Sequence, residues 1–303
     1  MYGQRVLVTG GAGFIGSTLA NHLAEDNELI ALDDLSFGTT ENLHDDVTFV
    51  EGDVRDDDLP ADVDVCFHLA ALSSRGMLED TPREGASVNV AGFVNLVEQV
   101  RATGCDTVVY ASTSSFYDDD LPHREDEPVR ASTGYEASML ARERYGEYYD
   151  DFYDDLAIAG TRFMSVYQGL GGAEAHKGEY ANTVSQWAAA IADGESPVLW
   201  GDGEQTRDFV HVSDVVRALE AIADERLSGV YNVGTGENHS FNDLIAFVND
   251  ALGTDVEPVY ESVPLAHYNY AQRRLIVGGA IAAAATVTRR DRRSPRERPE
   301  AGF

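Results

Sequence analysis

Lysine is almost missing from this sequence: Lys177 is the only one in 303 residues. Basic residues number 22 against 53 acidic ones, and the formal net charge is −31. A surface this acidic repels phosphate backbones, so we expect no nucleic-acid partner. It suits a cytoplasm of very high salt, where the Debye length falls to ~3 Å at 1 M. The composition therefore predicts a halophilic protein.

Cysteine and membrane-spanning apolar runs are also scarce. Cys66 and Cys105 are too few for a disulfide framework, and we expect both to be buried as small hydrophobic residues. The apolar run from Leu275 to Val287 has 13 residues, fewer than the ~20 that cross a bilayer. No signal peptide precedes the first predicted strand. These features predict a cytoplasmic protein with no membrane partner.

A glycine-rich turn is the first positive feature. The segment RVLVTGGAGFIGSTLANHLAE runs from a β-branched stretch into an apolar pattern of helical period. Gly10, Gly13 and Gly16 would provide a tight turn, close approach to a pyrophosphate, and close packing of helix on strand. Phe14 and Ile15 would open the helix, whose free N–H groups favour an anion. Taken alone, the spacing also fits an ordinary glycine-rich turn.

The next strand strengthens the interpretation as a dinucleotide site. ELIALDD ends near Asp33, 23 residues after Gly10, where a carboxylate can bind a ribose 2′-hydroxyl and repel a 2′-phosphate. NAD is therefore predicted in preference to NADP. Further cofactor contacts are expected beside the adenine and at the nicotinamide side, at Asp53 and Val54, and at Leu69, Ala70 and Ala71. His68 is interpreted as a packed strand residue.

Apolar runs at 47–53, 64–71 and 107–112 alternate with helical patterns at 14–25 and 86–102. This alternation predicts an α/β fold with a doubly wound parallel sheet, the Rossmann arrangement. We expect the NAD-binding domain over residues 1–164. A smaller, partly interleaved substrate-binding lobe would cover 165–272, and an atypical basic tail 273–303. The tail holds eight of the 22 basic residues, which suggests either a shifted reading frame or a genuine basic tether.

Several motifs in fixed order make the pattern more specific: VTGGAGFIG, LDDLSFG, GDVRD, HLAA, STSSFY, STGYEAS and GDGEQTRDFVHVSDVVRA. Together they resemble the extended short-chain dehydrogenase/reductase family, in particular its NAD-dependent nucleotide-sugar epimerases and dehydratases of the UDP-glucose 4-epimerase type. The resemblance implies that a sugar hydroxyl is oxidised with NAD and the hydride returned. It also implies a nucleotide-diphosphate sugar as substrate and a homodimer.

By the same resemblance, Tyr135 is the catalytic base and Thr113 the hydroxyl that binds the reacting sugar oxygen. A tyrosine with pKa ≈ 10 is a poor base near neutral pH unless a cation favours the phenolate. The family places a lysine four residues later, on the same helical face, but this chain has Met139. Arg142 and Arg144 are expected on other helical faces and as poor substitutes. We therefore expect impaired turnover with NAD binding largely kept.

The substrate lobe supplies weaker signals. The family's contact asparagine is replaced by Ser165, and Arg207 in QTRDF is predicted to grip a diphosphate, with a surface salt bridge as the alternative. Lys177 is expected to be exposed, and no metal site is predicted. Two other functions stay open: a non-catalytic NAD- or nucleotide-sugar-binding homologue, and a nucleotide-sugar 4,6-dehydratase. The dehydratase is less favoured because Ser114 and Ser115 follow the motif threonine.

Overall fold

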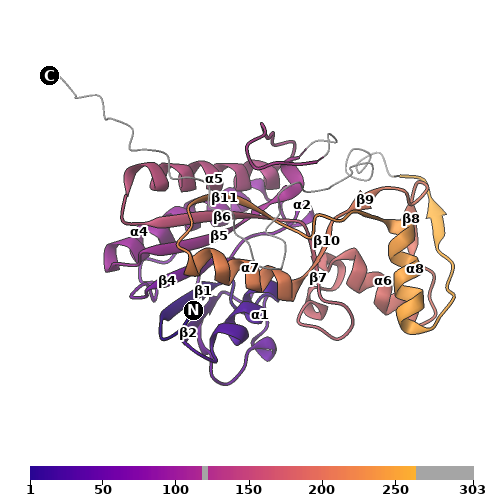
Figure 1. The fold of residues 1–303 in the computed structure, drawn as a ribbon, viewed down its shortest axis with the longest axis horizontal. Helices are drawn as coiled ribbons and strands as arrows, with labels where there is room; N and C mark the ends of the chain where they lie inside the picture. The colour runs from indigo at the N-terminus through magenta and orange to yellow at the C-terminus, as the bar shows by residue number, and fades with distance from the viewer. Residues whose placement is uncertain (118–121, 264–303) are drawn as a thin grey trace.

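The computed structural model describes residues 1–117 and 122–263 (Figure 1). The basic tail predicted at 273–303 lies outside these residues. No helix of the described part combines the length and apolar character needed to cross a membrane.

The centre of the molecule is a seven-stranded sheet in the order β11-β6-β5-β4-β1-β2-β3. Every neighbouring pair is parallel, as in β1 with β4, where Val6 pairs with Val65 and Thr9 with His68. The predicted doubly wound sheet is confirmed. The strands are β1 Arg5–Thr9, β2 Glu28–Asp33, β3 Thr48–Glu51, β4 Val65–His68, β5 Thr107–Thr113, β6 Ala157–Phe163 and β11 Gly229–Val233.

Helices cover both faces of this sheet because its strands are apolar on both sides. On one face, α1 (Phe14–Leu23) and α7 (Val212–Asp224) share a core cluster with the strands. On the other face, α4 (Phe93–Thr103) and α5 (Gly134–Phe152) enclose a second cluster. Figure 1 shows these two layers with the sheet between them. The short α2 (Arg75–Leu78), α3 (Pro82–Ala86) and the π-helix η2 (Ser87–Gly92) connect β4 to α4.

Local sequence fixes where α5 begins. Thr133 accepts a hydrogen bond from the Glu136 N–H, and the Glu136 carboxylate accepts one from the Thr133 N–H, so the two form a capping box. Glu136 Oε2 also accepts from Ser132 N at 2.5 Å. The start of α5 is thereby fixed, and with it the position of Tyr135 on the first turn.

The smaller lobe is built from α6, α8 and three two-stranded pairings, and it lies beside the end of the main sheet in Figure 1. It is interleaved with the large domain, because α7 and β11 come late in the chain yet belong to the main layers. The elements are α6 Thr183–Ala192, α8 Phe241–Leu252, β7 Ser165–Tyr167 with β10 Phe209–His211, β9 Thr206–Arg207 with β12 His239–Ser240, and β8 Val198–Trp200 with β13 Val259–Glu261; the 3-10 turns are η1 Thr40–Asn42, η3 Ser114–Phe116 and η4 Ala175–Tyr180.

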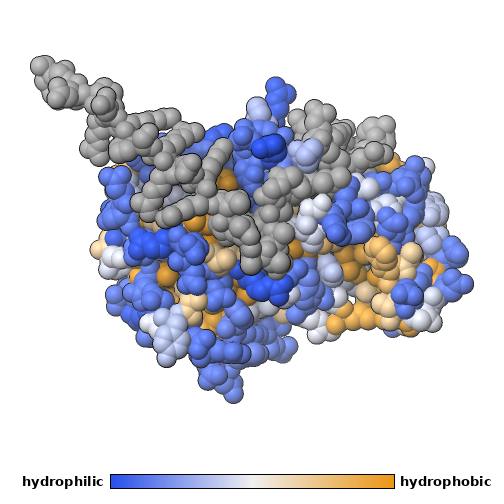
Figure 2. Space-filling model, in the orientation of Figure 1, coloured by the Kyte–Doolittle hydropathy of each residue, from blue (hydrophilic) through white to orange (hydrophobic). Residues whose placement is uncertain are grey.

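Polar side chains dominate the described surface on the face drawn in Figure 2. The run Asp56 to Asp58 is exposed, as expected of hydrated surface charge. Cys66 and Cys105 are free and buried, which confirms their interpretation as small hydrophobic residues. In the described ranges, no group of His, Cys, Asp or Glu residues is arranged to hold a metal ion.

Candidate active site

The glycine turn after β1 touches the segment that follows β4. Gly10 has φ +66°, and a Cβ there would lie 2.7 Å from Ala70 N, a contact that no side chain tolerates. Ala70 N also donates to Thr9 Oγ1 at 3.3 Å. The strand order reverses between β1 and β4, and in open α/β sheets the crevice at this point binds the ligand. The structure thus brings Gly10 together with the predicted segment Leu69, Ala70 and Ala71.

The start of α1 has the features of an anion site. Gly13 is its N-cap and makes no side-chain cap, so the first N–H groups, at Phe14 and Ile15, lie at the positive end of the helix dipole. A Cβ at Gly16 would lie 1.9 Å from Gly10 O, so only glycine allows this turn. The arrangement fits a pyrophosphate held by backbone N–H groups.

Asp33 lies beside the same turn, at the end of β2. Its Oδ2 accepts from Ala12 N at 3.1 Å and its Oδ1 from Leu35 N at 2.9 Å. Burial raises the pKa of Asp33, and these two hydrogen bonds oppose the rise. The carboxylate is therefore held in one orientation at the edge where the ribose of a dinucleotide is expected.

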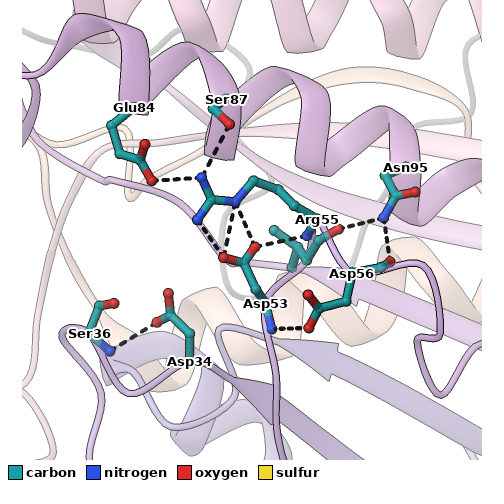
Figure 3. Close-up of polar contacts among 9 residues, drawn as sticks. Asp34, Ser36, Asp53, Arg55, Asp56, Glu84, Ser87 and Asn95 are labelled. Carbon is teal, nitrogen blue, oxygen red and sulfur yellow. Dashed lines mark hydrogen bonds and ion pairs between the residues drawn. The ribbon is translucent and has the colours of Figure 1, made fainter.

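Asp53 is also fixed, but by an arginine (Figure 3). Arg55 Nε donates to Asp53 Oδ1 at 2.8 Å, and its Nη1 reaches Glu84 at 2.7 Å and Ser87 at 3.2 Å. The hydrogen bond from Arg55 lowers the pKa of Asp53. This cluster ties the loop after β3 to α3 and η2, with Val54 buried beneath it. A contact of Asp53 and Val54 with adenine stays a prediction.

His68, the last residue of β4, is a packed strand residue. It is fully buried, its Nδ1 lies 2.8 Å from Thr9 Oγ1, and its ring centroid lies 5.5 Å from that of Phe93. Burial lowers the pKa of His68 well below its ordinary value. The imidazole is therefore neutral at physiological pH, where it links β4 to β1.

The three predicted catalytic positions lie on α5 and at the end of β5. Tyr135 is half-buried on the first turn of α5, and Met139 is 1% exposed on the next turn. Thr113 ends β5, donating to Ser115 Oγ at 3.0 Å and accepting from Ser115 N at 3.2 Å. Met139 fills the core at the place where the resemblance leads one to expect a lysine.

The expectation for Arg142 is wrong. Seven residues are nearly two turns of about 3.6 residues each, so Arg142 lies on the same face of α5 as Tyr135. The side chain is fully buried. Its Nε donates to Asn89 O at 2.9 Å, its Nη1 to Ala111 O at 3.2 Å, and its Nη2 to Ala70 O at 3.1 Å. By contrast, Arg144 is exposed and donates to Glu147.

Burial lowers the pKa of Arg142 to about 10, and the neighbouring Tyr135 and Tyr110 phenols oppose this shift. The guanidinium therefore remains charged at neutral pH. In the described part of the chain, no carboxylate lies within ion-pair distance of it. The spacing of Tyr135 and Arg142 in the sequence could have predicted their placement, since positions i and i+7 of a helix share a face.

Sequence reasoning also missed a buried ion pair on the same helix. Glu143 accepts two hydrogen bonds from Arg162 of β6, at 2.9 and 2.8 Å, and both side chains are at most 4% exposed. Ser112 Oγ donates to the same carboxylate at 2.5 Å, while Arg162 Nη1 donates to Tyr117 OH at 2.7 Å. These bonds fix α5 against β5 and β6.

Asn89 in η2 is a further supporting residue that sequence reasoning did not identify. Its side chain accepts from Leu72 N and donates to Leu72 O, at 2.9 and 3.1 Å, and it donates to Ser138 Oγ at 2.9 Å. The fully buried amide thereby joins the segment after β4 to α5. The only feature of the sequence that could have indicated this supporting role was an asparagine within an otherwise apolar helical pattern.

On the substrate side, Arg207 in β9 is 3% exposed and so does not lie on the surface. Its guanidinium lies 5.6 Å from the centroid of the Phe241 ring, and Nη1 donates to Thr206 O at 2.7 Å. Ser165 opens β7 and is half-buried, with its N–H donating to Asp208 O at 3.0 Å. Contacts of Arg207 and Ser165 with a substrate stay predictions.

Lys177 is not exposed, contrary to expectation. It is half-buried and lines a pocket with Ser36 to Thr39, the loop that follows Asp33, and with Met77, His176 and Tyr180. Burial lowers its pKa. The packing of η4 against this loop is a tertiary contact that no local sequence pattern predicts.

The fold and the site together define a dinucleotide-binding α/β protein with a second lobe. Residues 6–234 match the family described as "NAD dependent epimerase/dehydratase family", and the chain belongs to it.

Three known proteins illustrate the likeness. The UDP-glucose 4-epimerase of Mycolicibacterium smegmatis is 38% identical over 272 residues, covering 85% of each chain. The solved UDP-N-acetylglucosamine 4-epimerase of Methanobrevibacter ruminantium, in complex with UDP-N-acetylmuramic acid, superposes with a TM-score of 0.84 at 28% identity, covering 93% of this chain and 91% of that one. The Thermus thermophilus UDP-glucose 4-epimerase, in complex with NAD, gives 0.76 at 30% identity and covers 90% of both.

Proposed function

We propose that this protein is an NAD-dependent nucleotide-sugar 4-epimerase of the UDP-glucose 4-epimerase type, with reduced turnover. One observation supports the proposal most. Helix α5, which carries Tyr135, is fastened through Arg142 to Ala70 and Ala111, beside the carboxyl ends of β4 and β5. Ala70 in turn contacts the glycine turn. This connection supports a site in which the predicted base Tyr135 lies beside the predicted dinucleotide crevice.

In this proposal bound NAD would supply the hydride chemistry of epimerisation: oxidation at the sugar carbon, and return of the hydride to the opposite face of the ketone. Gly10, Gly13, Phe14 and Ile15 hold the pyrophosphate, and Asp33 binds the adenosine ribose. Backbone N–H groups and a fixed carboxylate suit these two roles.

Tyr135 removes the proton of the reacting hydroxyl, and Thr113 donates a hydrogen bond to the same oxygen. Arg207 grips the diphosphate of the substrate, and Ser165 is a further substrate contact. Because Met139 can neither donate to the ribose nor stabilise a phenolate, turnover is lower than a lysine would give.

The test is an epimerisation assay with several UDP-sugars in multimolar KCl. We expect slow, measurable interconversion by the parent protein and its loss in Tyr135→Phe. Met139→Lys should raise turnover by up to about a hundredfold, since two pKa units of activation correspond to ~2.7 kcal/mol. If the parent binds NAD but interconverts no sugar, and Met139→Lys does not change this, the non-catalytic alternative holds.

We also propose a cytoplasmic, halophilic homodimer that pairs through α5. Tyr145, Tyr148 and Phe152 are 42%, 41% and 70% exposed, and their spacing puts them on one stripe of the helix. Light scattering in high salt tests this. Changing Tyr148 and Phe152 together to serine should give monomers, and a parent protein that is already monomeric contradicts the pairing.

A further inference from the structure

Among residues 1–117 and 122–263, the buried Arg142 guanidinium has no acidic partner that would account for its charge. Its acceptors are the three neutral carbonyl oxygens of Asn89, Ala111 and Ala70. A fully buried cation is costly unless something compensates its charge, and carbonyl dipoles do so only in part. A nearby group that can become negative would complete the compensation, and Tyr135 lies two turns earlier on the same face of α5.

The direction of the side chain brings the two groups closer than their sequence separation suggests. Residues on an α-helix point back toward its N-terminus, and long side chains extend over the preceding turn. The Arg142 side chain follows this course, since its guanidinium reaches carbonyls beside the ends of β4 and β5. Met139, one turn before Arg142, is neutral and leaves this charge unopposed.

We infer that Arg142 is a positioning residue that acts on Tyr135: its fixed guanidinium supplies the positive charge that favours the phenolate form of the base. The inference rests on the proposed role of Tyr135. It accounts for the slow turnover proposed above for a chain with methionine at position 139. Arg142 takes over only the electrostatic part of a lysine's role, because three of its five N–H groups already donate to carbonyls, which fix the guanidinium in place.

In the described part of the chain, most other charged groups on elements packed against α5 are neutral or already paired, and Arg83 is exposed to solvent. His68 on β4 is neutral because burial lowers its pKa, and burial raises the pKa of Tyr110 on β5 above its ordinary range. Glu143 and Arg162 pair with each other. The remaining groups on α2, α3 and the capping box are Arg75 with Glu79, Glu84 with Arg55, the exposed Arg83, and Glu136 at the helix start.

The experiment is a spectroscopic titration of the Tyr135 phenol. The chain has 14 tyrosines, so phenolate absorbance is recorded against pH for each protein and for its Tyr135→Phe partner, and the difference isolates one phenol. In the parent protein we expect this phenol to titrate below the ordinary pKa ≈ 10 of tyrosine. A value at or above 10 in the parent would by itself overturn the inference, whatever happens to the variants.

The variants separate charge from packing. Arg142→Gln should raise the apparent pKa of Tyr135 by roughly 1–2 units, as expected for loss of a nearby opposite charge, whereas Arg142→Lys should retain most of the shift. Arg144→Gln, which removes an exposed arginine from the same helix, is the matched control and should change nothing. An Arg142→Gln titration within about 0.3 units of the parent means that Arg142 is merely structural.

No sugar takes part in this measurement, so it is independent of turnover. A lowered Tyr135 pKa in a protein that epimerises no nucleotide sugar supports the charge relation and refutes the proposed function. Epimerisation by a protein whose Tyr135 has an ordinary pKa supports the proposed function and refutes the charge relation. In the active protein, the alkaline shift in Arg142→Gln should reappear in the pH profile of kcat/KM.

Discussion

Gly16→Ala should abolish most NAD binding without unfolding the protein. A Cβ at this position would lie 1.9 Å from Gly10 O and 2.8 Å from Gly10 C, both below the 3.0 Å limit of real Cβ contacts. The Gly10 carbonyl also accepts from Gly13 N at 3.1 Å. Accommodating the methyl group therefore means rebuilding the turn whose N–H groups are proposed to hold the pyrophosphate.

The expected size can be worked out for thermal unfolding with and without NAD. Ligand at 100 times its Kd stabilises a protein by about 2.7 kcal/mol. At roughly 2–4 °C per kcal/mol for a chain of this size, that raises Tm by about 5–10 °C. If Gly16→Ala weakens binding about a hundredfold, the same NAD concentration contributes only about 0.4 kcal/mol, and Tm rises by about 1 °C.

Gly253→Ala is the control for stability alone. Gly253 ends α8 with φ +67°, and a Cβ there would meet nothing within 4 Å. Alanine in this left-handed conformation costs about 1–2 kcal/mol, so Tm without ligand should fall while the NAD-induced rise persists. A Gly16→Ala protein that keeps the full rise of the parent would refute our account of the glycine turn.

Three further predictions concern buried and paired groups. Glu143→Gln leaves a buried guanidinium without its carboxylate and should lower the free energy of unfolding by roughly 3–5 kcal/mol in a denaturant titration; a loss under 1 kcal/mol contradicts the buried pair. Burial raises the pKa of Cys66, and that of Cys105 to about 11, so neither thiol should react with iodoacetamide at pH 8 until the protein is denatured. The pKa of Asp53 is lowered by its arginine, so its stabilising contribution is present above the unfolded value of ~3.9 and is lost as pH falls through the lower folded value. Asp53→Asn should weaken this acid dependence of stability, and an unchanged pH profile of unfolding argues against it.

Most of the fold followed from local patterns. The apolar strands and the glycine spacing predicted the parallel sheet and its ligand crevice, because both depend on short-range periodicity. The pair of Glu143 and Arg162 could not be predicted, since it joins α5 to β6 across 19 positions and depends on tertiary packing. The half-burial of Lys177 depends in the same way on where η4 packs.

Arg142 is a different case, because its spacing from Tyr135 contained the information. What the sequence did not reveal is its environment. The acceptors are three main-chain carbonyls from segments 31 to 72 positions away, and main-chain oxygens leave no side-chain signature. A buried arginine with only such partners cannot be distinguished in the sequence from an exposed one.

Met139 and Arg142 lie three residues apart on one buried face of α5, so the choice of residue at one position constrains the other. A lysine at 139 beside the existing guanidinium would place two cations there, and at about 6 Å with an effective dielectric of 20 their repulsion is roughly 3 kcal/mol. Met139→Lys should therefore lower stability even where it raises turnover, and adding Arg142→Gln should recover much of that loss. Denaturant titrations of the parent, both single variants and the double variant give the coupling energy. If the losses of unfolding free energy in the two single variants add up to that of the double variant, the charges at the two positions do not interact.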